Sequence, residues 1–312
     1  MIWLGFAVVS VAVLLVMRRA IHRSLAPERV IESRTPADVG LLYRDVTLPT
    51  ENGKSLFGWF IPSKLIDRAS AVVLLHGWGG NAETMLPLAC PLHDAGFAML
   101  FIDARCHGQS DEDSFASMPR FAEDLGHAIE WLKQRDDIDT QAITAIGHSV
   151  GAAASLLAAS RRDDIAAVVS IAAFTHPVAI MRRWFASKGI PYRPIGWLML
   201  RYVEWVIGHR FDDIAPINTI RRVRCPALLV HGAEDATVPV SEAHAIHANR
   251  PNDHVRLKLV SGSHDDYADL DRELPVLADF LSDAVGRLRK SALDGRHVMY
   301  SCKSLGNHGK PD

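Results

Sequence analysis

The sequence has few cysteines and lacks the cysteine spacings of metal sites and disulfide frameworks. Its 312 residues include only Cys90, Cys106, Cys225 and Cys302, with no CxxC pair and no zinc spacing. Structural disulfides are therefore not expected, and a reducing compartment fits this cysteine usage. No metal or organic cofactor is implied.

The sequence also lacks an excess of charge of one sign. The formal net charge is -2, with no concentrated basic run, which argues against a nucleic-acid partner. Internal repeats and low-complexity tracts are absent too, so a repeat architecture is not expected. The hydrophobic fraction of 48% suits a globular domain with a substantial core.

One long apolar run stands at the amino terminus. Residues 2–17 carry no charged side chain, and Arg18, Arg19 and Arg23 follow at once. Sixteen helical residues span about 24 Å, slightly less than a bilayer core, and arginines can snorkel to the headgroups. We expect a transmembrane anchor over residues 1–21; a signal peptide or a hydrophobic surface helix are the alternatives. The basic flank predicts a membrane-anchored, single-pass protein with its catalytic domain in the cytoplasm.

Four regions follow from the pattern of the chain. After the anchor, residues 22–40 are polar and contain Pro27 and Pro36, which predicts a linker. Residues 41–289 alternate apolar runs with helical patterns and form the main domain. The polar residues 290–312 show no apolar period and are expected to be disordered.

The apolar runs predict a mostly parallel, twisted sheet flanked by helices. The first two runs, 43–48 and 56–61, form a hairpin around Asn52-Gly53. Continuous apolar runs typical of strands buried on both faces follow at 70–77, 97–104, 142–147, 165–173, 226–232 and 255–262. Helical segments lie between them and after them, at 82–95, 121–134, 150–160, 240–248 and 274–288. This alternation is the pattern of a doubly wound α/β fold.

One connection is too long for a simple crossover. Residues 174–224 are rich in Trp, Tyr, Met and Arg and look helical in pieces. We expect them to form a small helical cap above the carboxyl ends of the strands, where ligands bind in such sheets. The aromatic residues of this cap are candidates for an apolar substrate pocket, or else for ordinary helix packing: Trp184, Phe185, Trp197, Tyr202 and Trp205.

The segment Gly147-His148-Ser149-Val150-Gly151 places a serine between two glycines, at the junction of a predicted strand and a predicted helix. The spacing matches G-x-S-x-G, and its place between a buried strand and a helix is that of a nucleophile elbow. Such a turn holds the serine at positive φ, and side chains at the flanking glycines would collide with their neighbours. Ser149 is the candidate nucleophile.

A serine hydroxyl needs a base to take its proton, and the base needs an acid to hold its tautomer. His264 follows the last predicted strand and is the candidate base; His76 and His231 sit in His-Gly turns that suit loop support. Asp235, in the loop after the preceding strand, is the candidate acid, with the adjacent Glu234 as the alternative.

Two backbone donors are needed for the oxyanion of an acyl-transfer intermediate. The N–H group of Val150, at the start of the helix, is the first candidate. The second is the N–H group of Trp78 in the turn HGWGGN, where Gly77 and Gly79 allow a close approach. This turn is not a phosphate loop, because no Gly-Lys-Ser/Thr follows it.

The chain resembles the α/β-hydrolase superfamily, and more narrowly its lysophospholipase and serine-aminopeptidase-like group and the membrane-anchored Bem46-type hydrolases. The resemblance covers about Tyr43 to Leu288 and rests on HGWGGN, DARCHGQS, GHSVG and GAEDATVP…GSH in this order. The second motif carries Cys106 where the family has glycine, which puts the conformation of that loop in doubt. The resemblance implies the α/β-hydrolase fold and a serine, acid, histidine triad.

These motifs predict a serine hydrolase that cleaves small-molecule carboxylic esters or thioesters through an acyl-enzyme. A serine peptidase that binds a free amino terminus at Asp212-Asp213 is an alternative, and a catalytically silent binding module is another. The natural acyl group, the oligomeric state and the role of Cys106 are not encoded in these motifs.

Overall fold

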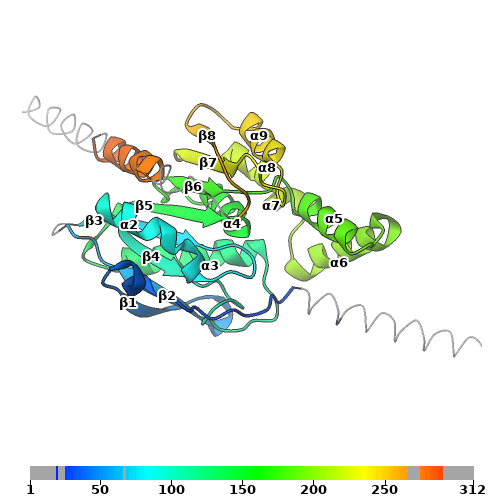
Figure 1. Cartoon of the computed structure of the whole chain (residues 1–312), viewed down its shortest axis with the longest axis horizontal. Coiled ribbons are helices and arrows are strands. Elements are labelled where there is room, and N and C mark those ends of the chain that lie inside the picture. The colour runs from blue at the N-terminus through cyan, green and yellow to red at the C-terminus, as the bar shows by residue number, and fades with distance from the viewer. Residues whose placement is uncertain (1–18, 20–24, 66–67, 266–274, 291–312) are drawn as a thin grey trace, which may run out of the picture.

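An eight-stranded sheet forms the centre of the protein (Figure 1). The structure is a computed structural model that describes residues 19, 25–65, 68–265 and 275–290. The strand order is β1-β2-β4-β3-β5-β6-β7-β8, and only β2 runs against its neighbours. The strands are β1 (Arg44–Pro49), β2 (Ser55–Ile61), β3 (Ala69–Leu75), β4 (Ala98–Ile102), β5 (Ile138–His148), β6 (Val168–Ile171), β7 (Ala227–Gly232) and β8 (Val255–Val260). The predicted hairpin and parallel sheet are confirmed.

Both faces of the sheet are covered, which explains the continuous apolar runs. In β3, Val73 and Leu75 belong to one buried cluster, and Val72 and Leu74 belong to the other. Successive side chains of a strand point to opposite faces, so each cluster fills one face. Helices α3 (Met118–Lys133), α4 (Val150–Ala159) and α9 (Val240–Ala248) contribute to the first cluster, and residues 275–290 contribute to the second.

The helix predicted over 82–95 is divided in two. Its first part is a 3-10 helix, η3 (Ala82–Leu88), and its second part is the short helix α2 (Ala89–Asp94). Pro87 lies inside η3. Because proline has no N–H group and its ring crowds the preceding turn, a regular α-helix through this position is disfavoured.

The predicted cap leaves the body of the protein after β6. It contains α5 (Pro177–Ser187), a π-helical turn η4 (Tyr192–Gly196) and α6 (Trp197–Ile207), then the short helices α7 (Phe211–Ile214), α8 (Pro216–Thr219) and η5 (Ile220–Arg222). Figure 1 shows α5 and α6 projecting from the body. The ring of His176 accepts a hydrogen bond from the Val178 N–H group (3.1 Å) and so caps α5.

Residues 25–40 lie along the body of the domain. Arg29 donates to the carbonyl oxygens of Gly108 (3.1 Å) and Ser110 (2.8 Å), and Arg34 pairs with Glu83 (2.9 Å). A 3-10 turn, η1 (Pro36–Val39), follows. The segment predicted as a linker is thus held by polar contacts over much of its length.

The predicted anchor at 1–21 lies outside the described residues apart from Arg19, and so does the tail from residue 291 onward. Among the residues that the structure does describe, no helix has the length and apolar character needed to cross a bilayer.

Candidate active site

Ser149 stands at the sharp turn between β5 and α4. Its backbone angles are φ 51° and ψ -112°, a conformation that residues other than glycine rarely adopt. The turn is held because the Ser149 N–H group donates to the Ile171 carbonyl (2.8 Å) and the Ser149 carbonyl accepts from Ala153 (3.0 Å). The positive φ expected of a nucleophile elbow is present.

The two flanking glycines are required by close backbone approaches. A Cβ atom on Gly147 would lie 2.2 Å from the Gly151 carbonyl oxygen. A Cβ atom on Gly151 would lie 2.4 Å from the carbonyl oxygens of Leu75 and His76. Any larger residue at either position would force backbone atoms apart, so the elbow depends on both glycines.

The imidazole of His264 lies between the serine and a carboxylate. Ser149 Oγ donates to His264 Nε2 at 3.0 Å, and His264 Nδ1 donates to Asp235 Oδ2 at 2.7 Å. His264 follows β8, Asp235 follows β7 and Ser149 follows β5, so all three are placed by carboxyl ends of parallel strands. Both His264 and Asp235 are buried.

The structure separates the two acids that the sequence left open. Asp235 Oδ1 accepts from the N–H groups of Thr237 (2.9 Å) and Val238 (2.7 Å), which leaves Oδ2 for His264. The Glu234 carboxylate instead accepts from the N–H group of Gly262 (2.6 Å), in the loop that leads to His264. Asp235 contacts His264 directly, and Glu234 contacts the loop that carries His264.

His148 supports the site in a way that the sequence analysis missed. Its ring lies 5.1 Å from that of His264, and its Nε2 donates to the His264 carbonyl oxygen at 2.9 Å. Burial lowers the pKa of His148, and with it the tendency of this ring to carry a charge beside His264. The one available signal was a titratable residue at the variable position before the nucleophile.

His76 and His231 have the loop-supporting contacts expected of them. His76 donates from Nδ1 to the Gly77 carbonyl (2.6 Å), and its Nε2 accepts from the Ala104 N–H group (3.0 Å). Burial lowers the pKa of His76 to about 3, so the ring is neutral. His231 donates to the Val238 carbonyl (2.7 Å) and so steadies the loop of the acid.

The turn that carries Trp78 runs directly beside the elbow. A Cβ atom on Gly77 would lie 3.3 Å from Ser149 Cβ and 3.1 Å from His148 Nδ1. Val150 is the first residue of α4, where an N–H group has no partner within the helix. The turn that carries Trp78 and the start of α4 therefore lie side by side, and the role of the two N–H groups as an oxyanion hole stays a prediction.

Beneath Trp78 lies a cluster of buried rings. The Trp78 ring stacks on Phe121 (6.5 Å between centroids) and meets the edge of His107 (5.6 Å). His107 donates from Nδ1 to the Arg105 carbonyl (3.0 Å), while its Nε2 is buried without a protein partner. Burial lowers the pKa of His107 to about 4, so this ring is neutral as well.

In the loop after β4, Cys106 adopts a left-handed backbone conformation that favours glycine. Cys106 has φ 68°, and its side chain is buried beside Asp113. The neighbouring Arg105 is also buried and pairs with Asp124 (2.7 Å). This buried ion pair fixes the loop, so the departure from the family motif leaves its left-handed turn intact.

The predicted substrate residues of the cap do not share one surface. Phe185 is 1% exposed and packs inside the cap against Gly196, whereas Trp184 and Trp197 are 40% and 46% exposed. Their role in substrate binding stays a prediction. Asp212, proposed in the alternative function to bind an amino group, already accepts from His176 Nε2 (3.0 Å).

Three potential metal ligands, His148, His264 and Asp265, come within 4.8 Å of one another. Both nitrogens of His264 already contact Ser149 and Asp235, so a metal here would break the hydrogen bonds just described. We therefore assign no metal to this cluster.

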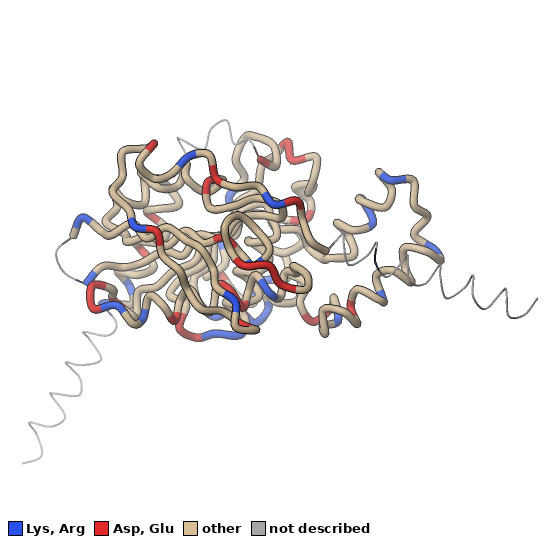
Figure 2. The backbone as a smooth tube through the Cα atoms, turned by 90° about the horizontal axis from the view of Figure 1, so that it is seen from below, with Lys and Arg blue, Asp and Glu red and all other residues tan. Residues whose placement is uncertain are grey.

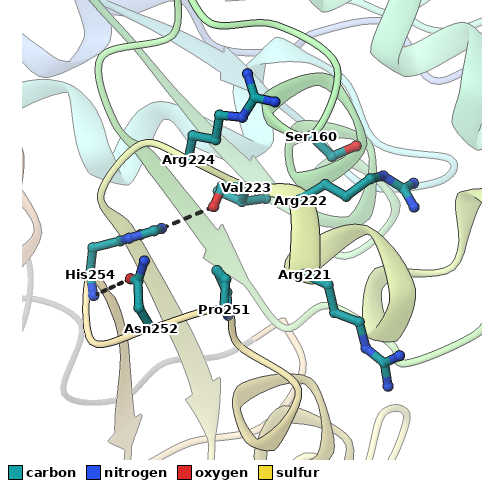
Figure 3. A pocket seen from close by; sticks show the side chains of 8 residues that line it. All are labelled: Ser160, Arg221, Arg222, Val223, Arg224, Pro251, Asn252 and His254. Atoms are coloured by element: carbon teal, nitrogen blue, oxygen red, sulfur yellow. Dashed lines mark hydrogen bonds between the residues drawn. The ribbon is translucent and has the colours of Figure 1, made fainter.

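A separate pocket of about 410 Å³ lies at the other edge of the sheet, before β7 and β8 (Figure 3). It is lined by Arg221, Arg222 and Arg224, whose guanidinium groups point in different directions. Arg224 pairs with Asp163 (2.9 Å) and Arg222 donates to the Asp213 carbonyl (3.3 Å). This pocket is remote from Ser149 and does not gather its charges on one point.

The architecture and the elbow are those of the α/β-hydrolase fold. A family model described as serine aminopeptidase, S33, matches residues 67–211. Among solved structures, an esterase of Pyrococcus furiosus is similar with a TM-score of 0.65 and 22% identity, over 84% of this chain and 98% of that one. The chain therefore has the α/β-hydrolase fold, and the serine aminopeptidase, S33, family model matches a little under half of it.

Among the sequence relatives are two uncharacterized bacterial proteins. An uncharacterized protein of Mycobacterium tuberculosis is 31% identical over 198 residues, and the match spans 64% of either chain. The uncharacterized protein YfhR of Escherichia coli K12 is 28% identical over 288 residues, 89% of this chain and 93% of YfhR. These relatives assign no substrate.

Proposed function

We propose that the protein is a serine hydrolase that cleaves carboxylic esters or thioesters of small molecules. The observation that carries the proposal is the chain of hydrogen bonds from Ser149 through His264 to Asp235, at 3.0 and 2.7 Å. The α/β-hydrolase fold and the similar fold of a solved esterase support it at the level of a hydrolase.

In the proposed reaction, Ser149 Oγ attacks the carbonyl carbon while His264 Nε2 takes the serine proton. The N–H groups of Trp78 and Val150 stabilise the negative oxygen of the tetrahedral intermediate. His264 then gives the proton to the leaving group, which departs and leaves an acyl-enzyme. A water molecule, deprotonated by the same nitrogen, releases the acid and restores Ser149.

Labelling with a fluorophosphonate probe tests this proposal on the full chain. We expect Ser149→Ala to lose labelling and to lose ester turnover by at least about 10⁴-fold. Ser160→Ala, at the far end of the same helix, is the matched control and keeps both. A p-nitrophenyl ester series from acetate to palmitate gives the preferred acyl length. Turnover of Ser149→Ala near the parent rate would show that the nucleophile is wrongly assigned.

The second candidate is a serine peptidase, which the description of the matched family model favours. Asp212, one of the two carboxylates (Asp212-Asp213) proposed to bind an amino terminus, accepts a hydrogen bond from His176, which weakens this alternative. Aminoacyl p-nitroanilides run beside the esters distinguish the two. Faster cleavage of the anilides by the parent protein would select the peptidase.

We also propose that residues 1–21 anchor the protein in a membrane and that the hydrolase domain is cytoplasmic. The apolar run at 2–17 and the arginines after it support this arrangement. Protease protection in sealed spheroplasts tests it, since a periplasmic or extracellular domain would be digested from outside.

A further inference from the structure

The outer face of helix α6 carries large apolar side chains that no described segment covers. Trp197 is 46% exposed, Leu198 is 53% exposed and Trp205 is 73% exposed. With about 100° between successive residues, these positions and Arg201 fall within about a quarter to a third of the helix circumference. Leu200 and Val203, on the opposite side, are buried. The helix therefore presents two apolar faces, and only one of them packs against the part of the protein that the structure describes.

The charges around this face are mostly positive, although Arg201 pairs with Glu204 (2.5 Å). Between Pro177 and Gly208 the sequence has five basic residues and a single acidic one, Glu204, although the whole chain is slightly acidic. Figure 2 shows blue positions predominating on the projecting helices. Lys188, Arg193 and Arg201 are exposed. A helix face with Trp and Leu, flanked by basic side chains, is the composition of a segment that lies in a membrane interface.

The amino-terminal end of the described chain lies on the same side of the protein as the cap (Figure 1). The continuous described chain begins at Leu25, whose carbonyl accepts a hydrogen bond from Ala116 (2.7 Å) in the loop after β4. This loop and the cap both follow carboxyl ends of strands. Figure 1 shows the blue start of the described chain on the side from which α5 and α6 project. The apolar residues 2–17 lie just ahead of this point in the sequence.

We propose that the outer face of α6, formed by Trp197, Leu198, Arg201 and Trp205, docks on a bilayer that contains anionic lipids. The apolar side chains enter the boundary between headgroups and acyl chains, and the basic side chains meet the lipid phosphates. The carboxyl edge of the sheet, with Ser149, then faces the membrane. The docking is a binding property and does not depend on the proposed esterase activity.

Tryptophan quenching by brominated lipid tests the docking on the full chain. The protein is incorporated into vesicles of phosphatidylcholine with a quarter phosphatidylglycerol, with or without bromine near the top of the acyl chains. The emission of Trp205 is obtained by subtracting the spectrum of Trp205→Phe from that of the parent. We expect bromine to reduce this emission at least about two-fold, since interfacial helices sit about 5–10 Å deep.

Trp131→Phe is the matched control, because Trp131 packs on the body beside Phe60 (5.6 Å). The emission of Trp131, obtained by subtracting the spectrum of Trp131→Phe from that of the parent, should be equal in vesicles with and without bromine. Lys188→Gln with Arg193→Gln should weaken the quenching of Trp205 and remove its dependence on phosphatidylglycerol.

Three results would overturn the proposal. The first is Trp205 emission that bromine leaves unchanged in protein that floats with the vesicles. The second is full-length protein that does not float with them at all. The third is a Trp205 already shielded from acrylamide without lipid in a protein that sediments as a dimer, which would make a second copy the occupant of the face.

Discussion

Replacing Asp235 with asparagine should trap His264 in the wrong tautomer while leaving the fold intact. Asp235 Oδ1 accepts from the N–H groups of Thr237 and Val238 at 2.9 and 2.7 Å. Only the carbonyl oxygen of an asparagine amide can accept these two bonds, so its NH₂ group must take the place of Oδ2. That group donates, and His264 Nδ1 must then accept. The ring proton moves to Nε2, which can no longer take the proton of Ser149.

The expected loss in kcat is about 10⁴-fold, which corresponds to about 5.5 kcal/mol of transition-state stabilisation. KM should change little, because Asp235 is buried behind His264 and contacts no open surface. The assay is the steady-state hydrolysis of the best p-nitrophenyl ester, with urea unfolding to show that the variant folds. Fluorophosphonate labelling should slow in parallel, because it needs the same activated serine.

Glu234→Gln is the matched control for this substitution. Its amide oxygen can still accept from the Gly262 N–H group, so the loop that leads to His264 keeps its contact. We expect kcat within about three-fold of the parent, since no proton transfer passes through this side chain. If Asp235→Asn kept activity within ten-fold of the parent, or if Glu234→Gln lost as much, the assignment of the acid would be refuted.

The remaining predictions concern the surroundings of the triad. His148→Phe removes the donor to the His264 carbonyl, and we expect kcat to fall about ten-fold with an unchanged KM; an unchanged kcat would deny His148 a positioning role. Burial and the neighbouring Glu32 raise the pKa of Asp103 to about 8. The native state therefore binds a proton that the unfolded chain releases above pH 4, and stability is lost as the pH rises toward 8. Glu32→Gln should reduce that loss by roughly 1–2 kcal/mol between pH 5 and 9 in urea unfolding, and identical pH profiles would refute the coupling.

Much of the sheet could be predicted because its strands are buried on both faces. A short continuous apolar run with turn residues at its ends, such as that of β3, is typical of a strand in the middle of a parallel sheet. The end of an element is less well determined. Strand β5 begins at Ile138, four residues before the predicted start. The prediction missed these residues because Asp139, Thr140 and Gln141 are polar and partly or fully exposed and so interrupt the apolar run. Pairing with β3 extends the strand, and no local pattern encodes that pairing.

The site could be predicted to the extent that it consists of local motifs in a fixed order. Ser149, Asp235 and His264 each follow a strand, and parallel strands bring those ends together. Contacts between distant segments could not be predicted in this way. The bonds from Arg29 to Gly108 and Ser110 join residues about 80 positions apart, and polar side chains in an irregular segment show no period. These hydrogen bonds form only when folding has brought the two segments together.

The sequence alone does not predict which face of a cap helix packs against the protein. Helix α6 is apolar on two faces, so its periodicity does not distinguish the face that packs from the face that is exposed. The sequence therefore suggested that Trp184, Phe185 and Trp197 line one pocket, whereas the structure buries Phe185 and exposes both tryptophans. Apolar composition identifies a segment that must be covered, and only the packing reveals what the protein itself leaves uncovered.

The strain at Ser149 favours catalysis over a binding module on the same fold. A positive φ at a residue other than glycine costs of order 1–3 kcal/mol, and a glycine at position 149 would remove that cost. Asp235 adds a second cost, because its carboxylate is buried and is stabilised only by hydrogen bonds within the site. A protein that only binds gains nothing from either feature. A hydrolase needs both, because the turn lifts the hydroxyl of Ser149 to His264 and the carboxylate holds the imidazole that takes its proton.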